Sequence, residues 1–135
     1  MKENEKGGAV VQYYITEIDI RKYGRVIPAL RTQQVIITDI QVEHIRTRHP
    51  EAAEDFNKYA KAILDDPDFI LENRPNTALL LKEIVDEGRK FQLVLRLCVP
   101  TDPEEYSNSV ITFTRIREKE WRRLLRNKKI LYKKE

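Results

Sequence analysis

The sequence predicts an α+β fold in which N-terminal helices pack on a mainly antiparallel four-stranded sheet, with a short C-terminal helix and a closing strand. Apolar residues recur every three or four positions in the first half of the chain, which is typical of helices. The second half changes to two-residue alternation, which is typical of strands. Helices that precede a run of strands favour the α+β class. The 135 residues suffice for one core, so we expect a polar tail at 1–8 and a single domain over 9–135.

Two strand candidates precede the helices. Residues 9–20 are rich in β-branched and aromatic side chains, although their alternation is imperfect. Residues 34–37 form a second short run of the same kind. Gly24 and Pro28 lie between the two runs and indicate an irregular connector.

Two consecutive helices are predicted next. Thr38 and Gln41 have the spacing of a capping box, which opens a helix at position 39 or 40. Pro50 disfavours helical geometry at His49 but suits the first position of a new helix, so His49 marks a corner. The second helix ends at residues 65–67. Its core-facing stripe consists of Ala53, Phe56, Ala60, Ile63 and Leu64.

The C-terminal half contains the predicted sheet. Segments 78–85 and 90–99 flank a turn that contains Gly88, which predicts a hairpin of antiparallel strands. Its core face is predicted at the alternating positions Phe91, Leu93, Leu95, Leu97 and Val99. The remaining elements are a strand over 108–117, an amphipathic helix over 118–127 and a closing strand over 129–133.

Composition limits the classes of protein that the chain can belong to. Hydrophobic residues make up 41% and charged residues 35%, as in soluble globular proteins. Every apolar run falls short of the roughly 20 residues that cross a bilayer, so we expect no membrane partner. The polar N-terminus and the single cysteine favour a cytoplasmic location. Cys98 lies in an apolar strand segment and is expected to be buried filler rather than a nucleophile.

Positive charge is concentrated at the C-terminal end. The segment from Arg115 to Glu135 holds ten Lys or Arg and three Glu, a net charge of +7, whereas the whole chain carries only +3. Such a segment attracts polyanions, because neutralised phosphates release counterions. A solvated helix face with a basic tail explains the charge equally well.

Cofactor and metal chemistry find little support. Only Gly7 and Gly8 of the four glycines are close together, which excludes a phosphate-binding glycine loop. His44 and His49 are five positions apart and have no cysteine pair or third histidine beside them. We therefore expect neither a metal nor a cofactor.

Polar residues interrupt the predicted strands. Lys82, Arg96 and Thr112 can converge on the sheet face away from the main core, although sequence does not fix the register between strands. Solvated strand charges and β-propensity are the alternatives.

His44 falls one turn before Arg48 on the same helix face. A histidine with cations and hydroxyls can cleave RNA without metal, by activating the ribose 2′-OH and stabilising the phosphorane.

Five segments resemble, in this order, parts of phage and mobile-element nucleases grouped with barnase, EndoU, colicin-type tRNases and RelE (the BECR fold). They are VIITDIQVEHIRTRHP (35–50), DDPDFILENRPNTALLLKEI (65–84), FQLVLRL (91–97), NSVITFTRI (108–116) and KKILYKKE (128–135). The resemblance runs from about residue 9 to the C-terminus. It implies N-terminal helices packed on a four-stranded antiparallel sheet, and a metal-independent ribonuclease activity.

The resemblance also implies the site residues. Catalytic roles fall to His44, His49, Lys82, Arg96 and Thr112, and substrate-binding roles to Arg48, Ser109, Tyr132 and Lys133. Apart from the resemblance, the basic stretch from Arg115 to Lys134 is expected to guide RNA toward the site, which makes Arg115 a further substrate-binding candidate. His44 is the expected general base or acid, and His49 the second proton-transfer group. Ser109 and Thr112 have opposite alternation phases, so both serve one site only where a bulge separates them, and we favour Thr112.

The leading hypothesis is a toxin-like, metal-independent endoribonuclease that cleaves RNA, tRNA included, by 2′-OH transesterification. One alternative is a non-catalytic RNA-binding module of the same fold. Another is an accessory protein of a phage or mobile element that acts through contacts with an immunity or phage protein.

Overall fold

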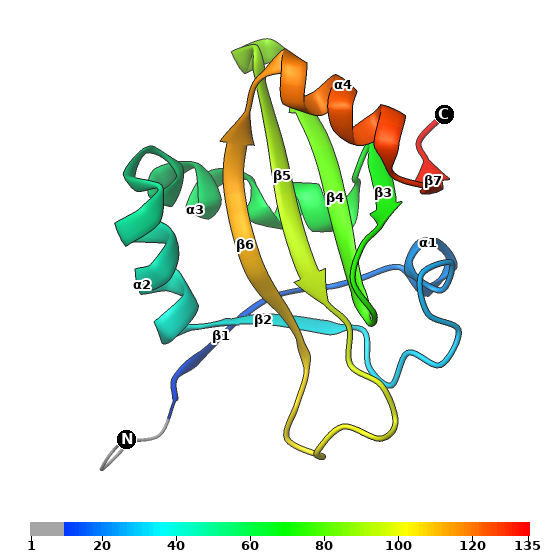
Figure 1. Ribbon diagram of the computed structural model, residues 1–135. Helices are drawn as coiled ribbons and strands as arrows, with labels where there is room; N and C mark the ends of the chain where they lie inside the picture. The colour runs from blue at the N-terminus through cyan, green and yellow to red at the C-terminus, as the bar shows by residue number, and fades with distance from the viewer. Residues whose placement is uncertain (1–9) are drawn as a thin grey trace.

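Seven strands form one mixed sheet in the order β1-β2-β6-β5-β4-β3-β7 (Figure 1). The computed structural model describes residues 10 to 135, so the tail predicted at 1–8 lies outside the described residues. The strands are β1 (Gln12–Glu17), β2 (Gln34–Thr38), β3 (Phe69–Glu72), β4 (Thr77–Ile84), β5 (Arg89–Arg96), β6 (Asn108–Ile116) and β7 (Ile130–Lys133). Neighbouring strands are antiparallel except β2 and β6, which are parallel.

Helices cover the two faces of the sheet unequally. The helices are α1 (Ile20–Tyr23), α2 (Asp39–Arg48), α3 (Pro50–Asp65) and α4 (Glu118–Asn127), with a 3-10 turn η1 (Val85–Glu87). In Figure 1, α3 lies behind the sheet, α2 lies beside β6, and α4 crosses only the upper ends of the strands in front. Within residues 10 to 135, every helix is too short or too polar to cross a membrane.

The predicted four-stranded antiparallel sheet with N-terminal helices is wrong. Strands β1 and β2 come before α2, and they join the sheet where Val35 and Ile36 pair in parallel with Asn108 and Ser109. Strand β3, only four residues long, enters between β4 and β7. Local alternation marks a strand but carries no information about its partner, so such distant pairings are not visible in the sequence.

Local signals located the two central helices. The Thr38 hydroxyl accepts a hydrogen bond from the Gln41 N–H at 3.2 Å, and α2 begins at Asp39. Pro50 is the first residue of α3, and His49 takes a non-helical conformation between the two helices. The predicted start of α2 and the predicted corner at His49 are therefore both confirmed. The reciprocal bond of a capping box is absent among the described residues, because the buried Oε1 of Gln41 has no hydrogen-bond partner.

The main core lies between α3 and the sheet. The alternating residues of the second hairpin strand, Phe91, Leu93, Leu95 and Leu97, are fully buried against the α3 side, as predicted. Cys98 is also buried. Burial of each such Leu or Phe stabilises the fold by about 2 kcal/mol. A smaller cluster under α4 covers part of the other face and contains Leu71, Leu79, Leu81, Trp121 and Leu124.

A β-bulge in β6 changes which side chains share a face. The pairs across β5 and β6 are Val94 with Thr112, Leu95 with Val110, and Arg96 with Ser109. Ile111 is the extra residue opposite this step. Because one residue is inserted, Ser109 and Thr112 come to lie on the same face despite their opposite phases in the sequence. The bulge that Ser109 and Thr112 need in order to serve one site is therefore present.

Candidate nucleic-acid interface

The sheet face opposite α3 is only partly covered. Helix α4 crosses the upper ends of the strands on this face (Figure 1) and packs over the β3 and β4 side. The side chains of β5 and β6 below it stay partly exposed. We call these residues the open face: Gln92, Arg96, Ser109, Thr112 and Thr114. Gln92 pairs with Thr114, and Arg96 pairs with Ser109. The open face therefore presents hydroxyls, an amide and one guanidinium around Val94, which pairs with Thr112 and packs against the cluster under α4.

Arg96 reaches the open face as predicted, but its charge is already paired. Its guanidinium donates to both carboxylate oxygens of Asp102, at 2.5 and 2.9 Å. The hydrogen bond from Arg96, followed by that from the Val99 N–H, lowers the pKa of Asp102 well below its usual range. The pKa of Arg96 is raised by the same carboxylate. A phosphate that bound Arg96 would have to share it with Asp102.

Lys82 does not lie on the open face. It shares the opposite face with Leu80 and Ile84, as its sequence phase requires. Its ammonium lies 3.4 Å from Asp66 and 3.3 Å from Asp68. The convergence of Lys82 with Arg96 and Thr112 that we expected from the sequence is therefore absent.

The helix histidine lies on α2, at the edge of the sheet. His44 and Arg48 are both exposed and line one hollow of about 600 Å³ with Thr47 and other α2 residues. The Val42 and Arg46 side of α2 faces α3. His44 and Arg48 are thus turned away from α3, and the hollow contains no residue of β4, β5 or β6. His49 stays partly buried at the helix corner.

The predicted C-terminal pair lies near the other edge of the sheet. Tyr132 and Lys133 belong to β7, which is four strands from β6 in the sheet order. At a strand spacing of about 4.8 Å, this separates them from Ser109 by roughly 19 Å. The Tyr132 ring instead contacts the cations of Lys22 and Arg25. Neither residue is part of the open face.

A hollow of about 600 Å³ at the upper end of β5 and β6 gathers positive charge. Its cations are Arg89, Lys90, Arg115 and Arg117, and we call it the basic hollow. Its lining also includes two carboxylates, those of Glu51 and Glu118. Arg115 was a predicted substrate-binding residue, whereas the other three cations were not predicted.

A buried carboxylate holds two of these cations in place. Asp55 of α3 is 4% exposed and accepts hydrogen bonds from Arg89 at 3.2 Å and from Arg115 at 2.5 Å. The bond to Asp55 raises the pKa of Arg115. Lys90 pairs with Glu118 at 2.9 Å. Among residues 10 to 135, no carboxylate lies within 4.0 Å of Arg117, so this exposed cation is available to a ligand.

The sequence contained signals for the basic hollow. Arg89 and Lys90 follow the Gly88 turn, and residues 115–117 stand opposite them across the antiparallel pair, where Phe91 pairs with Arg115. Asp55 interrupts an otherwise apolar helix stripe, which indicates a buried ion pair. The sequence does not give the register between β5 and β6, and without it these residues cannot be assigned to one hollow.

The residues predicted from the sequence are therefore divided among several places. Arg96, Ser109 and Thr112 share the open face, whereas Arg115 lines the basic hollow from the opposite, α3 face of the sheet. His44 and Arg48 share a separate hollow on α2. Comparisons with protein-family models, with curated proteins and with solved structures find no match to this chain.

Proposed function

We propose that this protein binds single-stranded RNA, with backbone phosphates in the basic hollow and the adjoining nucleotides on the open face. The observation that carries this proposal is the set of four cations around one hollow, two of them fixed by the buried Asp55. Fixed guanidinium groups lose little side-chain entropy when they bind, and their planar donors match phosphate oxygens. The geometry therefore suits a phosphate better than it suits a neutral ligand.

The basic hollow reaches both faces of the sheet at the upper end of β5 and β6. Arg89 and Arg115 lie on the α3 face, where both bind Asp55, whereas Lys90 lies on the face of Gln92 and Thr114. Lys90 precedes Gln92 by two residues in β5, and Thr114 precedes Ile116 by two residues in β6. Two residues along a strand span about 7 Å, which is close to the distance between successive phosphates of an extended strand. A nucleic-acid chain that binds Arg89 and Arg115 therefore has to pass around the upper end of β5 and β6, beside Trp121 of α4, to reach the open face.

The open face favours RNA over DNA as the polyanion. Ser109, Thr112 and Thr114 offer hydroxyls that both donate and accept hydrogen bonds, as the ribose 2′-OH does. The resemblance of the sequence to ribonucleases of the BECR group supports the same choice. Arg96 adds a positive charge that Asp102 partly neutralises.

The proposal is tested by fluorescence anisotropy with labelled single-stranded RNA and DNA of one sequence at low salt. We expect RNA to bind more tightly, and Arg117→Gln to weaken binding about fivefold because it removes one phosphate contact. Arg21→Gln removes the same charge from an exposed site on α1 and is the matched control. Equal losses in the two variants, or no binding of RNA, would contradict the proposal.

Metal-independent RNA cleavage is a second candidate, favoured by the shared exposure of His44 and Arg48 in one hollow. In this reaction His44 takes the proton of a ribose 2′-OH, whose oxygen forms a bond to its own phosphorus. The bond from phosphorus to the 5′ oxygen breaks, and a second acid, for which His49 is the candidate, protonates that oxygen. Arg48 would stabilise the phosphorane.

Cleavage is separated from binding by incubating RNA with the protein in EDTA and analysing the ends of the products. Cleavage predicts 2′,3′-cyclic phosphate ends that disappear in His44→Ala, whereas RNA binding by this variant persists. Intact RNA after long incubation with a protein that binds it would leave the binding function alone. Undiminished cleavage by His44→Ala would remove His44 from the mechanism.

A further inference from the structure

A third surface hollow lies on the side of the molecule that carries β1. It has a volume of about 480 Å³, within the range of about 300 to 1,000 Å³ that is typical of small-molecule sites. Strand β1, helix α2 and helix α3 form its walls. We call it the β1 groove, and it is lined by Tyr13, Tyr14, Ile15, Ile37, Val42, Arg46, Phe56, Asn57, Ala60 and Lys61.

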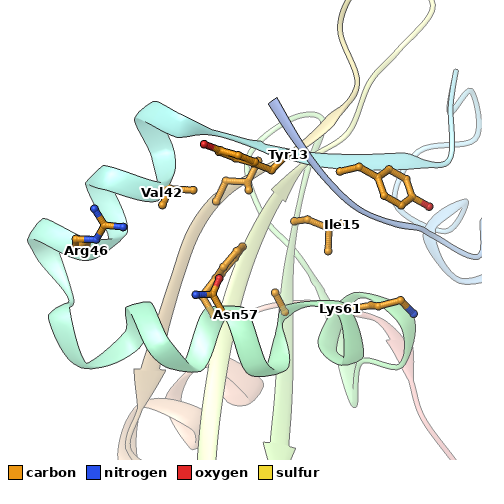
Figure 2. A pocket seen from close by; sticks show the side chains of 10 residues that line it. Tyr13, Ile15, Val42, Arg46, Asn57 and Lys61 are labelled. Carbon is orange, nitrogen blue, oxygen red and sulfur yellow. The ribbon is translucent and has the colours of Figure 1, made fainter. Parts of the chain in front are cut away.

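The floor and the rim of the β1 groove differ in chemistry. Ile37 and Phe56 are buried and form an apolar floor, whereas Tyr13 is 51% exposed at the rim. Figure 2 shows Tyr13 and Asn57 on opposite sides of the opening, with Arg46 and Lys61 toward its two ends. An exposed aromatic ring beside an apolar floor suits a flat ring, which it can cover on one face.

Two cations line the β1 groove. They are Arg46 and Lys61, and among residues 10 to 135 no carboxylate lines it. Both cations have carboxylate partners outside the groove, Glu43 at 2.9 Å and Asp65 at 2.7 Å. The Arg46 pair is largely exposed, 62% and 64%, and exposed pairs contribute little to stability, so an anion can take the guanidinium at small cost.

Asn57 adds a directional group. Its side chain is exposed on α3 and points to the same opening, and within residues 10 to 135 it makes no side-chain hydrogen bond. An amide offers two donors and an acceptor in one plane, the pattern that nucleobase edges recognise. The β1 groove therefore combines a ring-stacking surface, an amide and a guanidinium.

We propose that the β1 groove binds a nucleotide. The base lies against the Tyr13 ring and the apolar floor, Asn57 hydrogen-bonds to the edge of the base, and Arg46 binds the phosphate. The same chemistry is offered by a free mononucleotide and by a nucleotide unit of an RNA strand. This inference does not depend on the proposed RNA function, because it rests on residues of β1, α2 and α3 that do not belong to the basic hollow or the open face.

The first experiment titrates the full chain with adenosine 5′-monophosphate, adenosine and inorganic phosphate by isothermal titration calorimetry. We expect the mononucleotide to bind with a Kd below about 1 mM, and each fragment to bind at least about tenfold more weakly. A trinucleotide of RNA is titrated in parallel. Tighter binding of the trinucleotide identifies an RNA strand as the source, and equal or weaker binding identifies the free nucleotide.

Variants then locate the site. Arg46→Gln and Tyr13→Leu should each weaken binding of the preferred ligand about tenfold, while Tyr13→Phe, which keeps the ring, should restore it. Arg21→Gln and Lys58→Gln are the matched controls, since both cations are exposed and lie outside the groove. A thermal unfolding curve for each variant separates loss of the site from loss of the fold.

The outcomes are decisive in both directions. A loss confined to Arg46→Gln and Tyr13→Leu, with the fold intact, supports a nucleotide site in the β1 groove. Absence of binding by mononucleotide and trinucleotide, or an equal effect of the control variants, overturns it. Failure of the RNA proposal would appear instead as an unchanged RNA affinity of Arg117→Gln. Failure of the nucleotide proposal and failure of the RNA proposal are therefore distinguishable.

Discussion

Asp55 is a charged residue inside the packed face of α3, where it joins the helix to β5 and β6 through Arg89 and Arg115. Removing one partner of a fully buried ion pair costs about 3 to 5 kcal/mol. The two guanidinium side chains here are each 37% exposed, so water compensates part of that loss. We predict that Asp55→Asn lowers the free energy of unfolding by about 2 kcal/mol, measured by urea denaturation.

Glu54→Gln is the control for Asp55→Asn. Glu54 is the exposed neighbour on the same helix, and its neutralisation should change the free energy of unfolding by less than about 0.5 kcal/mol. Equal effects of the two substitutions would show that Asp55 does not anchor the basic hollow.

Asp102 gives the fold a dependence on acid. Its pKa is lowered by the hydrogen bond from Arg96 and then by that from the Val99 N–H. A lowered carboxyl pKa contributes stability that is fully present above the unfolded-state value, about 4, and is lost as the pH falls toward the folded-state value. We predict that the difference in unfolding free energy between wild type and Asp102→Asn is largest near neutral pH. It should shrink between pH values of about 4 and 2, and a constant difference would contradict this account.

For individual residues, the sequence predicted which face of the sheet a side chain lies on better than it predicted which side chains meet in one site. Arg96 and Thr112 were assigned correctly to the face away from the main core, because Phe91, Leu93 and Leu95 establish the opposite phase. The expected position of Lys82 on that face was wrong, because Lys82 has the same phase as Leu80, which is buried in the main core, and Ile84, which packs against it. Ser109 depended on a bulge, which no pattern in its own strand reveals.

Helix α2 depends on its N-terminal cap. The Thr38 hydroxyl is the side-chain acceptor for the Gln41 N–H, one of the helix donors without a partner inside the helix. We predict that Thr38→Ala lowers the free energy of unfolding by about 1 kcal/mol. Thr38→Ser retains the acceptor and should lose much less in the same urea titration. Equal losses would mean that packing of the Thr38 methyl group, rather than capping, stabilises this helix end.

Elements with local signals were predicted, and elements that depend on distant partners were not. Helices α2, α3 and α4 follow from caps, Pro50 and apolar stripes. Strand β3 has four residues, too few for alternation to stand out, and its hydrogen bonds come from both β4 and β7. Strands β1 and β2 were visible as candidates, but their place in the sheet depends on the short parallel contact with β6. The missing information was thus about pairing.

Across the whole molecule, the fold distributes the C-terminal positive charge instead of gathering it. Arg122 and Arg123 pair with Glu118 and Glu120 along α4, and Lys134 pairs with Asp66. Arg115 and Arg117 instead join Arg89 and Lys90 from another strand. The net charge of the segment predicted an interaction with a polyanion, but the surface where we propose that it binds is defined only by the pairing of β5 with β6.

The salt dependence of RNA affinity tests the central claim most directly. Three or four phosphates bound in and beside the basic hollow predict a slope of log K against log salt concentration of about −2 to −3 for single-stranded RNA. Arg117→Gln should reduce the magnitude of that slope by about 0.7, while Arg21→Gln leaves it unchanged. A slope near zero for the wild type, or identical slopes for wild type and Arg117→Gln, would contradict RNA binding at the basic hollow.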